Sequence, residues 1–183
     1  MKIKNLIKII VPIIAVILTI IITIVLIGKL KNKREIDDMY ELLEENNIQD
    51  TDNTDLKLEN GVIGIIKIEK IGFEGLVYEG TELSTLDKSV GHFENSPIFN
   101  GNVCLAAHNN SKFWKNLNKL QEGDLITYTC LLGKKTYKVC NINIISSDDW
   151  TLLENSDTNF ITLITCVHKK PSQRLCVQGI EDK

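Results

Sequence analysis

The sequence has little proline and glycine, no excess of basic residues and no internal repeat. Three prolines and eleven glycines occur among 183 residues, which excludes collagen-like and low-complexity chains. Lys and Arg number 21 against 24 Asp and Glu, a formal net charge of -3. Because nucleic-acid binding needs a basic surface, we expect no nucleic-acid partner. The 43% of hydrophobic and 25% of charged residues are typical of a folded globular protein.

Recognisable disulfide and metal-binding patterns are also lacking. The five cysteines are Cys104, Cys130, Cys140, Cys166 and Cys176. An odd set cannot pair completely within one chain, and no two of them form a CxxC motif. We expect all except Cys166 to be small buried residues on strands. A zinc site made by Cys104 and Cys166, each with the histidine that follows it, is an alternative. Its spacings are not those of common zinc motifs, and we predict no metal site.

One long apolar run stands near the N-terminus. Residues 9–27 read IIVPIIAVILTIIITIVLI and carry no charge. As a helix they extend about 28 Å, close to the thickness of one hydrocarbon core. A core helix of a soluble protein keeps a polar face, and a signal peptide has a shorter run with a small-residue cleavage site. We therefore predict an uncleaved anchor in a lipid bilayer. Lysines flank both ends, so charge alone does not orient it.

The remaining chain changes character at residue 61. Residues 29–60 are polar and include a short helical stripe of apolar side chains at residues 36–43, followed by the linker-like QDTDNTD. Beyond residue 61, apolar runs rich in β-branched residues alternate with turns: GVIGIIKI, GLVYEG, NVCLAAH, DLITYTCL, KTYKVCNINII, FITLITCV and RLCVQGI. This pattern predicts a mainly β domain, a closed barrel or a sandwich. Only residues 111–120 look helical within it.

We accordingly expect three parts: an N-terminal tip and transmembrane anchor (1–28), a polar stalk with a short helix (29–60) and a β domain (61–183).

Two apolar strands of that domain end in residues suited to nucleophilic catalysis. Cys166 ends one and is followed by the polar HKKPSQ, and His108 ends another. A nearby imidazole can generate or stabilise a thiolate. Arg174 begins the next strand, where a short turn brings its guanidinium beside the thiol to bind an oxyanion.

These residues resemble the sortases, membrane-anchored cysteine transpeptidases of Gram-positive bacteria. Residues 162–166, TLITC, are similar to the family's TLxTC nucleophile motif, and Arg174 matches the arginine that opens the following strand. Residues 102–108, NVCLAAH, resemble the strand that ends in the catalytic histidine. GLVYEG at residues 75–80 and the Gly91-His92 pair match weaker family features in the same order.

The resemblance implies a closed sortase-type β-barrel with a few short helices behind one transmembrane helix. It implies that the Cys166 thiolate cleaves an LPxTG-like sorting signal through a thioester, with His108 as acid and base and Arg174 at the oxyanion. It also implies Thr165 in the substrate site; His92 is either a groove residue or a structural one. The partners implied are surface proteins with a C-terminal sorting signal and a peptidoglycan-precursor amine. The N-terminus would be cytoplasmic and the catalytic domain extracellular.

Two departures from the family pattern bear on subclass. Ala107 stands where a glycine is usual before the histidine, and Glu69 replaces a proline of the first strand. The compact body resembles class A or D, and the class stays open. No cofactor is expected; some relatives use calcium, but no acidic cluster can be assigned to it.

Two other functions remain alternatives: a membrane-tethered cysteine peptidase that releases its product to water, and a catalytically silent binding module.

Overall fold

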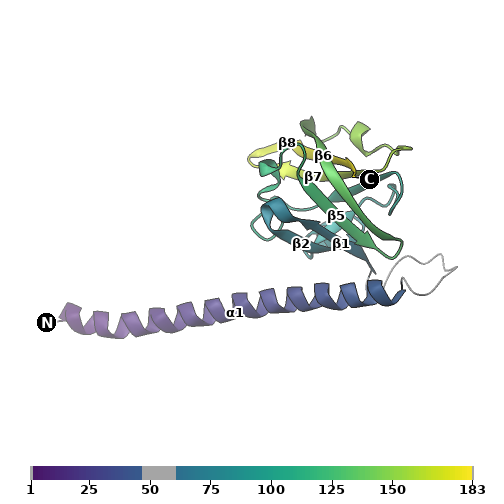
Figure 1. Ribbon diagram of the computed structural model, residues 1–183. Coiled ribbons are helices and arrows are strands. Elements are labelled where there is room, and N and C mark those ends of the chain that lie inside the picture. Colours follow the sequence, from purple (N-terminus) through teal and green to yellow (C-terminus); the bar gives the residue numbers. More distant parts are fainter. Residues whose placement is uncertain (1, 47–60, 183) are drawn as a thin grey trace. The chain divides into compact units, whose positions relative to one another are not determined.

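A computed structural model describes residues 2–46 and 61–182, and the chain divides into two compact units, Met1–Glu41 and Leu42–Lys183. The first unit consists of most of helix α1 (Lys2–Asn46), which runs without a break (Figure 1). The helical stripe predicted at residues 36–43 is therefore part of α1 and not a separate helix. The rest of the predicted stalk, residues 47–60, lies outside the described residues.

Helix α1 has the length and composition needed to cross a membrane. Apolar side chains such as Ile13, Ile20 and Val25 are about half exposed along it. Exposed apolar side chains on every side of a helix are unfavourable in water and favourable in a hydrocarbon environment. The helix thus supports the predicted membrane anchor.

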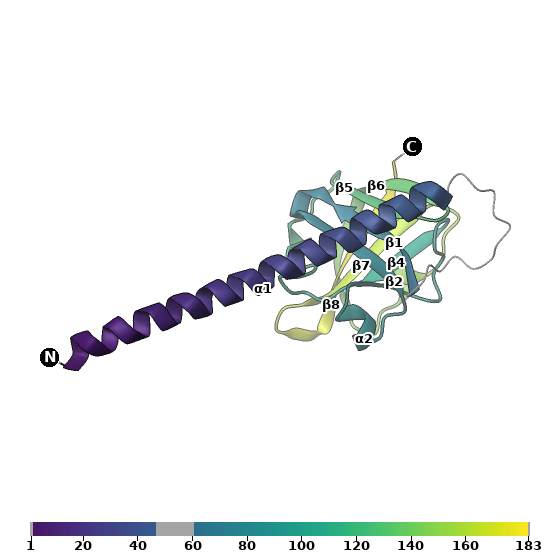
Figure 2. The same cartoon turned by 90° about the horizontal axis from the view of Figure 1, so that it is seen from below.

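The second unit contains a closed barrel of eight strands (Figures 1 and 2). The strands are β1 (Val62–Ile68), β2 (Phe73–Glu79), β3 (Val90–His92), β4 (Asn102–Ala106), β5 (Leu125–Cys130), β6 (Gly133–Ser146), β7 (Phe160–Val167) and β8 (Lys170–Glu181). Their order round the barrel is β1-β2-β3-β4-β7-β8-β6-β5. The short helices are η2 (Glu69–Ile71), α2 (Leu83–Leu86), η3 (Leu117–Lys119) and η4 (Thr151–Leu153). The predicted mainly β class with a closed barrel is confirmed.

Most neighbouring strands are antiparallel, but two pairs, β2 with β3 and β4 with β7, are parallel. β4 and β7 are in register from Asn102 opposite Phe160 to Ala106 opposite Ile164. Parallel neighbours end at the same edge of a sheet. The segments that follow β4 and β7 therefore meet at one edge, although 58 residues separate them along the chain.

The barrel interior is filled by fully buried aliphatic and aromatic side chains. Ile63, Val103, Leu163 and Val177 come from four different strands, and none exposes any surface. Each buried aliphatic side chain of this size contributes about 1.5–3 kcal/mol relative to an exposed one. This packing gives the rigid frame on which the strand ends are held.

The seven predicted apolar runs all form strands, but two other segments differ from expectation. β3 has only three residues and no alternating pattern; it fits tightly, since a Cβ on Gly91 would collide with the Gly80 carbonyl. Residues 111–120 form turns and the single 3-10 turn η3, not an α-helix. The backbone bonds differ from those of an α-helix: the Phe113 and Lys115 N–H groups both donate to the Asn110 carbonyl, and the Trp114 N–H donates to the His108 carbonyl. The predicted apolar side chains of this segment, Phe113, Trp114, Leu117 and Leu120, still enter the core.

Candidate active site

Three predicted catalytic residues lie in one row across the barrel wall. Cys166 near the end of β7 pairs with Arg174 on β8. On the other side of β7, the parallel register with β4 ends at Ala106 opposite Ile164. The Ala107 N–H donates to the Ile164 carbonyl (3.3 Å), so the chain still follows β7 there, and the same spacing carried on by two residues aligns His108 with Cys166. Adjacent strands are about 4.8 Å apart. The fold thus brings His108, Cys166 and Arg174 together, and all three line one cavity of about 280 Å³, hereafter the thiol pocket.

Hydrogen bonds fasten the segment after β4 to β7 on both sides of His108. The Thr165 hydroxyl donates to the Ala107 carbonyl (2.7 Å), and the Asn109 side-chain amide donates to the Cys166 carbonyl (2.6 Å). Because these bonds flank His108, the imidazole is held near the thiol although β4 itself ends at Ala106. Thr165 is 2% exposed and lines the thiol pocket, but its hydroxyl is engaged with Ala107.

A bulged hairpin positions Arg174. The predicted polar loop after Cys166 is mostly strand: β8 starts at Lys170, and the register shifts between Cys166 and Val167. Lys169 has a φ of 59°, the left-handed conformation that such tight turns use. The Arg174 Nη1 donates to the carbonyls of Pro171 (2.7 Å) and Gln173 (2.9 Å) within the bulge. Its Nε and Nη2 make no hydrogen bond with the residues that the structure describes.

His108 is half-buried and has an acidic partner that the sequence did not suggest. Its Nε2 lies 3.2 Å from Asp87 Oδ1, at the end of α2. The Lys112 ammonium donates to the main-chain carbonyls of Asp87 and Lys88, which fixes this turn against the segment after His108. A carboxylate that contacts one ring nitrogen of an imidazole orients the ring. Asp87 is therefore placed to orient His108.

Cys166 opens on a second cavity as well. This outer pocket, of about 710 Å³, is lined by Cys166, Asn109, Lys115, Ile144 and His168 among others. The thiol pocket has an apolar wall that includes Leu83, Leu86, Ile145 and Ile164. Cys166 therefore lines both pockets, and the outer one has the larger share of polar lining residues.

His92 is placed away from the thiol pocket. It is 1% exposed, with Nδ1 3.0 Å from Glu79 Oε1 and Nε2 2.8 Å from Ser96 Oγ. Ser96 Oγ in turn accepts the Cys104 backbone N–H. These contacts fasten the β3–β4 connection to the barrel, so the geometry favours the structural alternative for His92.

Of the other cysteines, Cys104, Cys130 and Cys176 are buried as predicted, whereas the prediction for Cys140 is wrong. Cys140 is exposed because its position on β6 faces outward between buried Val139 and half-buried Asn141. Burial raises the pKa of Cys104 and of Cys176 to about 12. Among the described residues, no three His, Cys, Asp or Glu side chains are grouped to hold a metal ion, which removes the support for the zinc alternative.

Asn109 and Trp150 are two further site residues that sequence reasoning missed. Trp150, 57% exposed, belongs to the connection between β6 and β7 and lines the thiol pocket. That connection is fastened by Asn102, whose side-chain amide donates to the carbonyls of Leu152 and Glu154, both at 2.9 Å. An isolated tryptophan in a polar loop and an asparagine after a histidine are the only sequence signs of these roles.

Comparison with known proteins agrees with this geometry. A family model described as the sortase domain matches residues 66–181. The chain belongs to the sortase family. It is 31% identical to Sortase D of Bacillus subtilis (strain 168) over 106 residues, covering 56% of this chain and 53% of that protein. It is 32% identical to Sortase A of Bacillus anthracis over 123 residues, covering 64% and 59%.

Solved sortase structures share the fold. A Clostridium perfringens Sortase D5 transpeptidase matches with a TM-score of 0.69 and 31% identity, covering 83% of this chain and 98% of that one. Sortase C1 from Streptococcus agalactiae matches with a TM-score of 0.66 and 31% identity, covering 72% and 73%. The chain spans little more than half the length of the curated relatives it matches. The relatives named sortase A, C and D have nearly the same sequence identity to this chain, so sequence identity does not indicate one class.

Proposed function

We propose that this protein is a membrane-anchored cysteine transpeptidase that cleaves an LPxTG-like sorting signal and joins the acyl part to a cell-wall amine. The single observation that carries the proposal is that His108 just after β4, Cys166 on β7 and Arg174 on β8 line one pocket. A thiol with an acid–base group on one side and a guanidinium on the other is suited to acyl transfer through a thioester.

In the first half-reaction the Cys166 thiolate attacks the carbonyl carbon of the threonine in the sorting signal. The carbonyl oxygen becomes an oxyanion, to which Arg174 donates through Nε and Nη2 while Nη1 holds the bulge. His108 gives a proton to the leaving amine as the C–N bond breaks, and a thioester remains. Asp87, 3.2 Å from the imidazole, orients the ring for this proton transfer.

The second half-reaction runs in the opposite sense. An acceptor amine attacks the thioester, His108 takes a proton from it, and the C–S bond breaks to regenerate the thiolate. The apolar thiol pocket suits the Leu and Pro of the acyl part, which leaves the polar outer pocket for the leaving and entering amines. All the catalytic groups in these steps are side chains of this protein, so the proposal includes no cofactor.

The proposed substrates and location follow from the same reaction. The acyl donors are surface proteins with a C-terminal sorting signal, and the acceptor is an amine of a peptidoglycan precursor. Both are found outside the cytoplasmic membrane, so we place the N-terminus in the cytoplasm and the barrel outside. The apolar part of α1 supports the anchoring.

The test uses the full chain in neutral detergent, mixed with a panel of LPxTG-like peptides with and without a glycine oligomer as acceptor. Intact-mass spectrometry should show a peptide-sized adduct, absent in Cys166→Ala, and a product joined to the acceptor. An adduct that persists in Cys166→Ala would reject the assignment of the nucleophile.

The same experiment separates the alternatives. A peptidase would form the adduct but release only hydrolysed peptide, whatever the acceptor concentration. A silent binding module would give neither adduct nor product, and Cys166→Ala would then change nothing except stability.

A further inference from the structure

A third cavity continues from the thiol pocket, and it differs from it in charge. This cavity, of about 620 Å³ and hereafter the acidic pocket, is lined by Thr81, Glu82, Phe93, Glu94, Trp150 and Glu154 among others. Three of its residues, Thr81, Phe93 and Trp150, also line the thiol pocket. The two cavities therefore share a wall, and a bound chain that leaves the thiol pocket on this side enters the acidic pocket.

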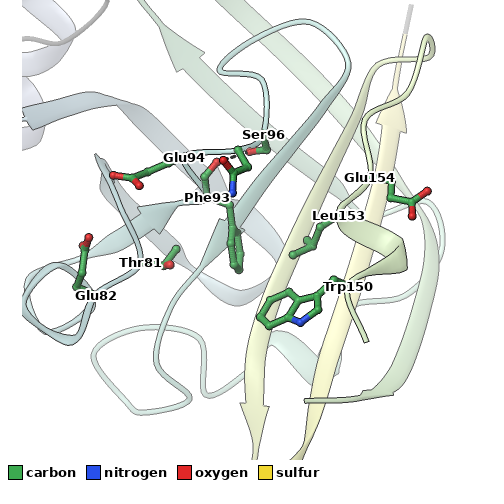
Figure 3. A pocket seen from close by; sticks show the side chains of 9 residues that line it. Thr81, Glu82, Phe93, Glu94, Ser96, Trp150, Leu153 and Glu154 are labelled. Atoms are coloured by element: carbon green, nitrogen blue, oxygen red, sulfur yellow. Dashed lines mark hydrogen bonds between the residues drawn. The ribbon is translucent and has the colours of Figure 1, made fainter. Parts of the chain in front are cut away.

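Two aromatic rings form the centre of the acidic pocket. Phe93 and Trp150 meet edge to face, with ring centroids 6.1 Å apart. In Figure 3 Phe93, Trp150 and Leu153 lie between two acidic sides: Glu82 and Glu94 stand on one side, and Glu154 stands on the other with its carboxylate directed outward. No lysine or arginine is among the described residues that line it.

This combination favours a cationic side chain. The face of a tryptophan attracts ammonium and guanidinium groups, and the apolar stem of a Lys or Arg packs against rings and leucine. The three carboxylates add attraction that decays with salt. The outer pocket on the other side of Cys166 has the opposite character, with Lys115 and His168 and no acidic residue among its described lining.

We propose that the acidic pocket binds the residues that immediately precede the sorting motif and selects donors with a Lys or Arg there. The inference rests on the proposed function, which sets the direction of the donor. The acyl part occupies the thiol pocket, where Arg174 and the apolar wall lie, so the residues before it extend past Phe93 and Trp150. The charge contrast between the acidic and outer pockets then orients the donor on the thiol.

The test compares donor peptides that differ at one residue. One Lys is placed at each of the four positions before the motif, against a Gln peptide, and acyl-enzyme formation on the full chain in neutral detergent is timed by intact mass. At one or more positions, Lys should raise the rate about threefold to tenfold at low salt. The Lys-to-Gln rate ratio should fall to about one in the triple variant Glu82→Gln, Glu94→Gln, Glu154→Gln, and also in about 0.5 M NaCl.

Glu122→Gln, on an exposed turn outside the three pockets, is the matched control and should keep the wild-type ratio. A ratio of one in the wild type, with acylation by the Gln peptide intact, would overturn this inference and leave the proposed function standing. A ratio that the triple variant preserves, or that appears only with an added divalent cation, would also overturn it. No adduct with any peptide would reject the proposed function itself, and this inference with it.

Discussion

At the scale of single residues, Arg174 has two tasks that one side chain must satisfy at once. Its Nη1 holds the bulge of the β7–β8 hairpin through two carbonyls, and its other donors face the thiol pocket in the proposed reaction. A guanidinium can do both because its donors are fixed in one plane.

Arg174→Lys should therefore lower the rate of acyl-enzyme formation about 100-fold or more, the usual loss for an oxyanion donor. A lysine keeps the charge but cannot donate in two directions with fixed geometry. The rate is measured by intact mass, with a thermal melt to show that the barrel still folds. Near-normal turnover would contradict the oxyanion role.

Thr165→Val gives a second prediction at this scale. Valine keeps the shape but removes the hydrogen bond to Ala107, leaving a buried carbonyl without its donor, at a cost of about 1–2 kcal/mol. Acylation should fall at least about tenfold, since His108 is released from its position beside Cys166.

The control is Thr127→Val. Thr127 is a half-buried residue on β5 away from the pockets, so the rate of acylation in this variant should stay within about twofold of the wild-type rate. If Thr165→Val lowered only the affinity for peptide, with the maximal rate intact, Thr165 would instead be a substrate-binding residue.

At the scale of elements, the connection between β6 and β7 depends on a small buried polar network. Asn102 donates to the carbonyls of Leu152 and Glu154, accepts from the Thr162 hydroxyl, and is 3% exposed. The Gln178 amide donates to the same hydroxyl at 3.2 Å. Trp150 directly precedes η4, so this network also holds Trp150 in place. Trp150 lines both the thiol pocket and the acidic pocket.

Asn102→Asp should destabilise this connection by about 3 kcal/mol, because a carboxylate cannot donate to the two carbonyls and would face them with like charge. Proteolysis within residues 147–159 should become much faster than in the wild type, and higher peptide concentrations should be needed for half-maximal acylation. Asn143→Ala, at an exposed position on β6, is the control. Unchanged proteolysis in Asn102→Asp would mean that the connection is held by other contacts.

The apolar runs predicted seven of the eight strands because each run is long enough to carry a β pattern by itself. β3 was missed because its three residues are held by close packing of Gly91 and by pairing with β2 and β4, which no local pattern encodes. His108, Cys166 and Arg174 could be selected as candidates because they lie at the ends or beginnings of apolar runs in the sequence. Asp87 and Asn109 could not, since only tertiary contacts give them their roles.

At the scale of the whole molecule, the buried thiols and phenols make stability depend on alkaline pH. Burial raises the pKa of Cys104 and Cys176 from 9.0 to about 12 and also raises those of Cys130, Tyr128 and Tyr137. In this range the unfolded chain loses these protons first, so the folded state holds more protons and stability falls as pH rises.

The free energy of unfolding should thus be insensitive to these groups below about pH 9. Between pH 9 and 12 it should fall by up to about 1.4 kcal/mol per pH unit for each group that titrates only in the unfolded chain. Thermal melts of the full chain in detergent, followed by near-UV circular dichroism, measure this. A melting temperature that stays constant from pH 8 to 11 would contradict it.

The parallel pairing of β4 with β7 has a consequence for when the protein becomes reactive. His108 and Cys166 are 58 positions apart, as are Ala107 and Thr165, which share a hydrogen bond, and such non-local parallel contacts form late because a long loop must close first. Before that closure the chain carries an ordinary cysteine with no imidazole or guanidinium beside it. Under the proposed function, the thiol, imidazole and guanidinium are brought together only with the native fold, so the chain cannot form an acyl-enzyme before its barrel has closed.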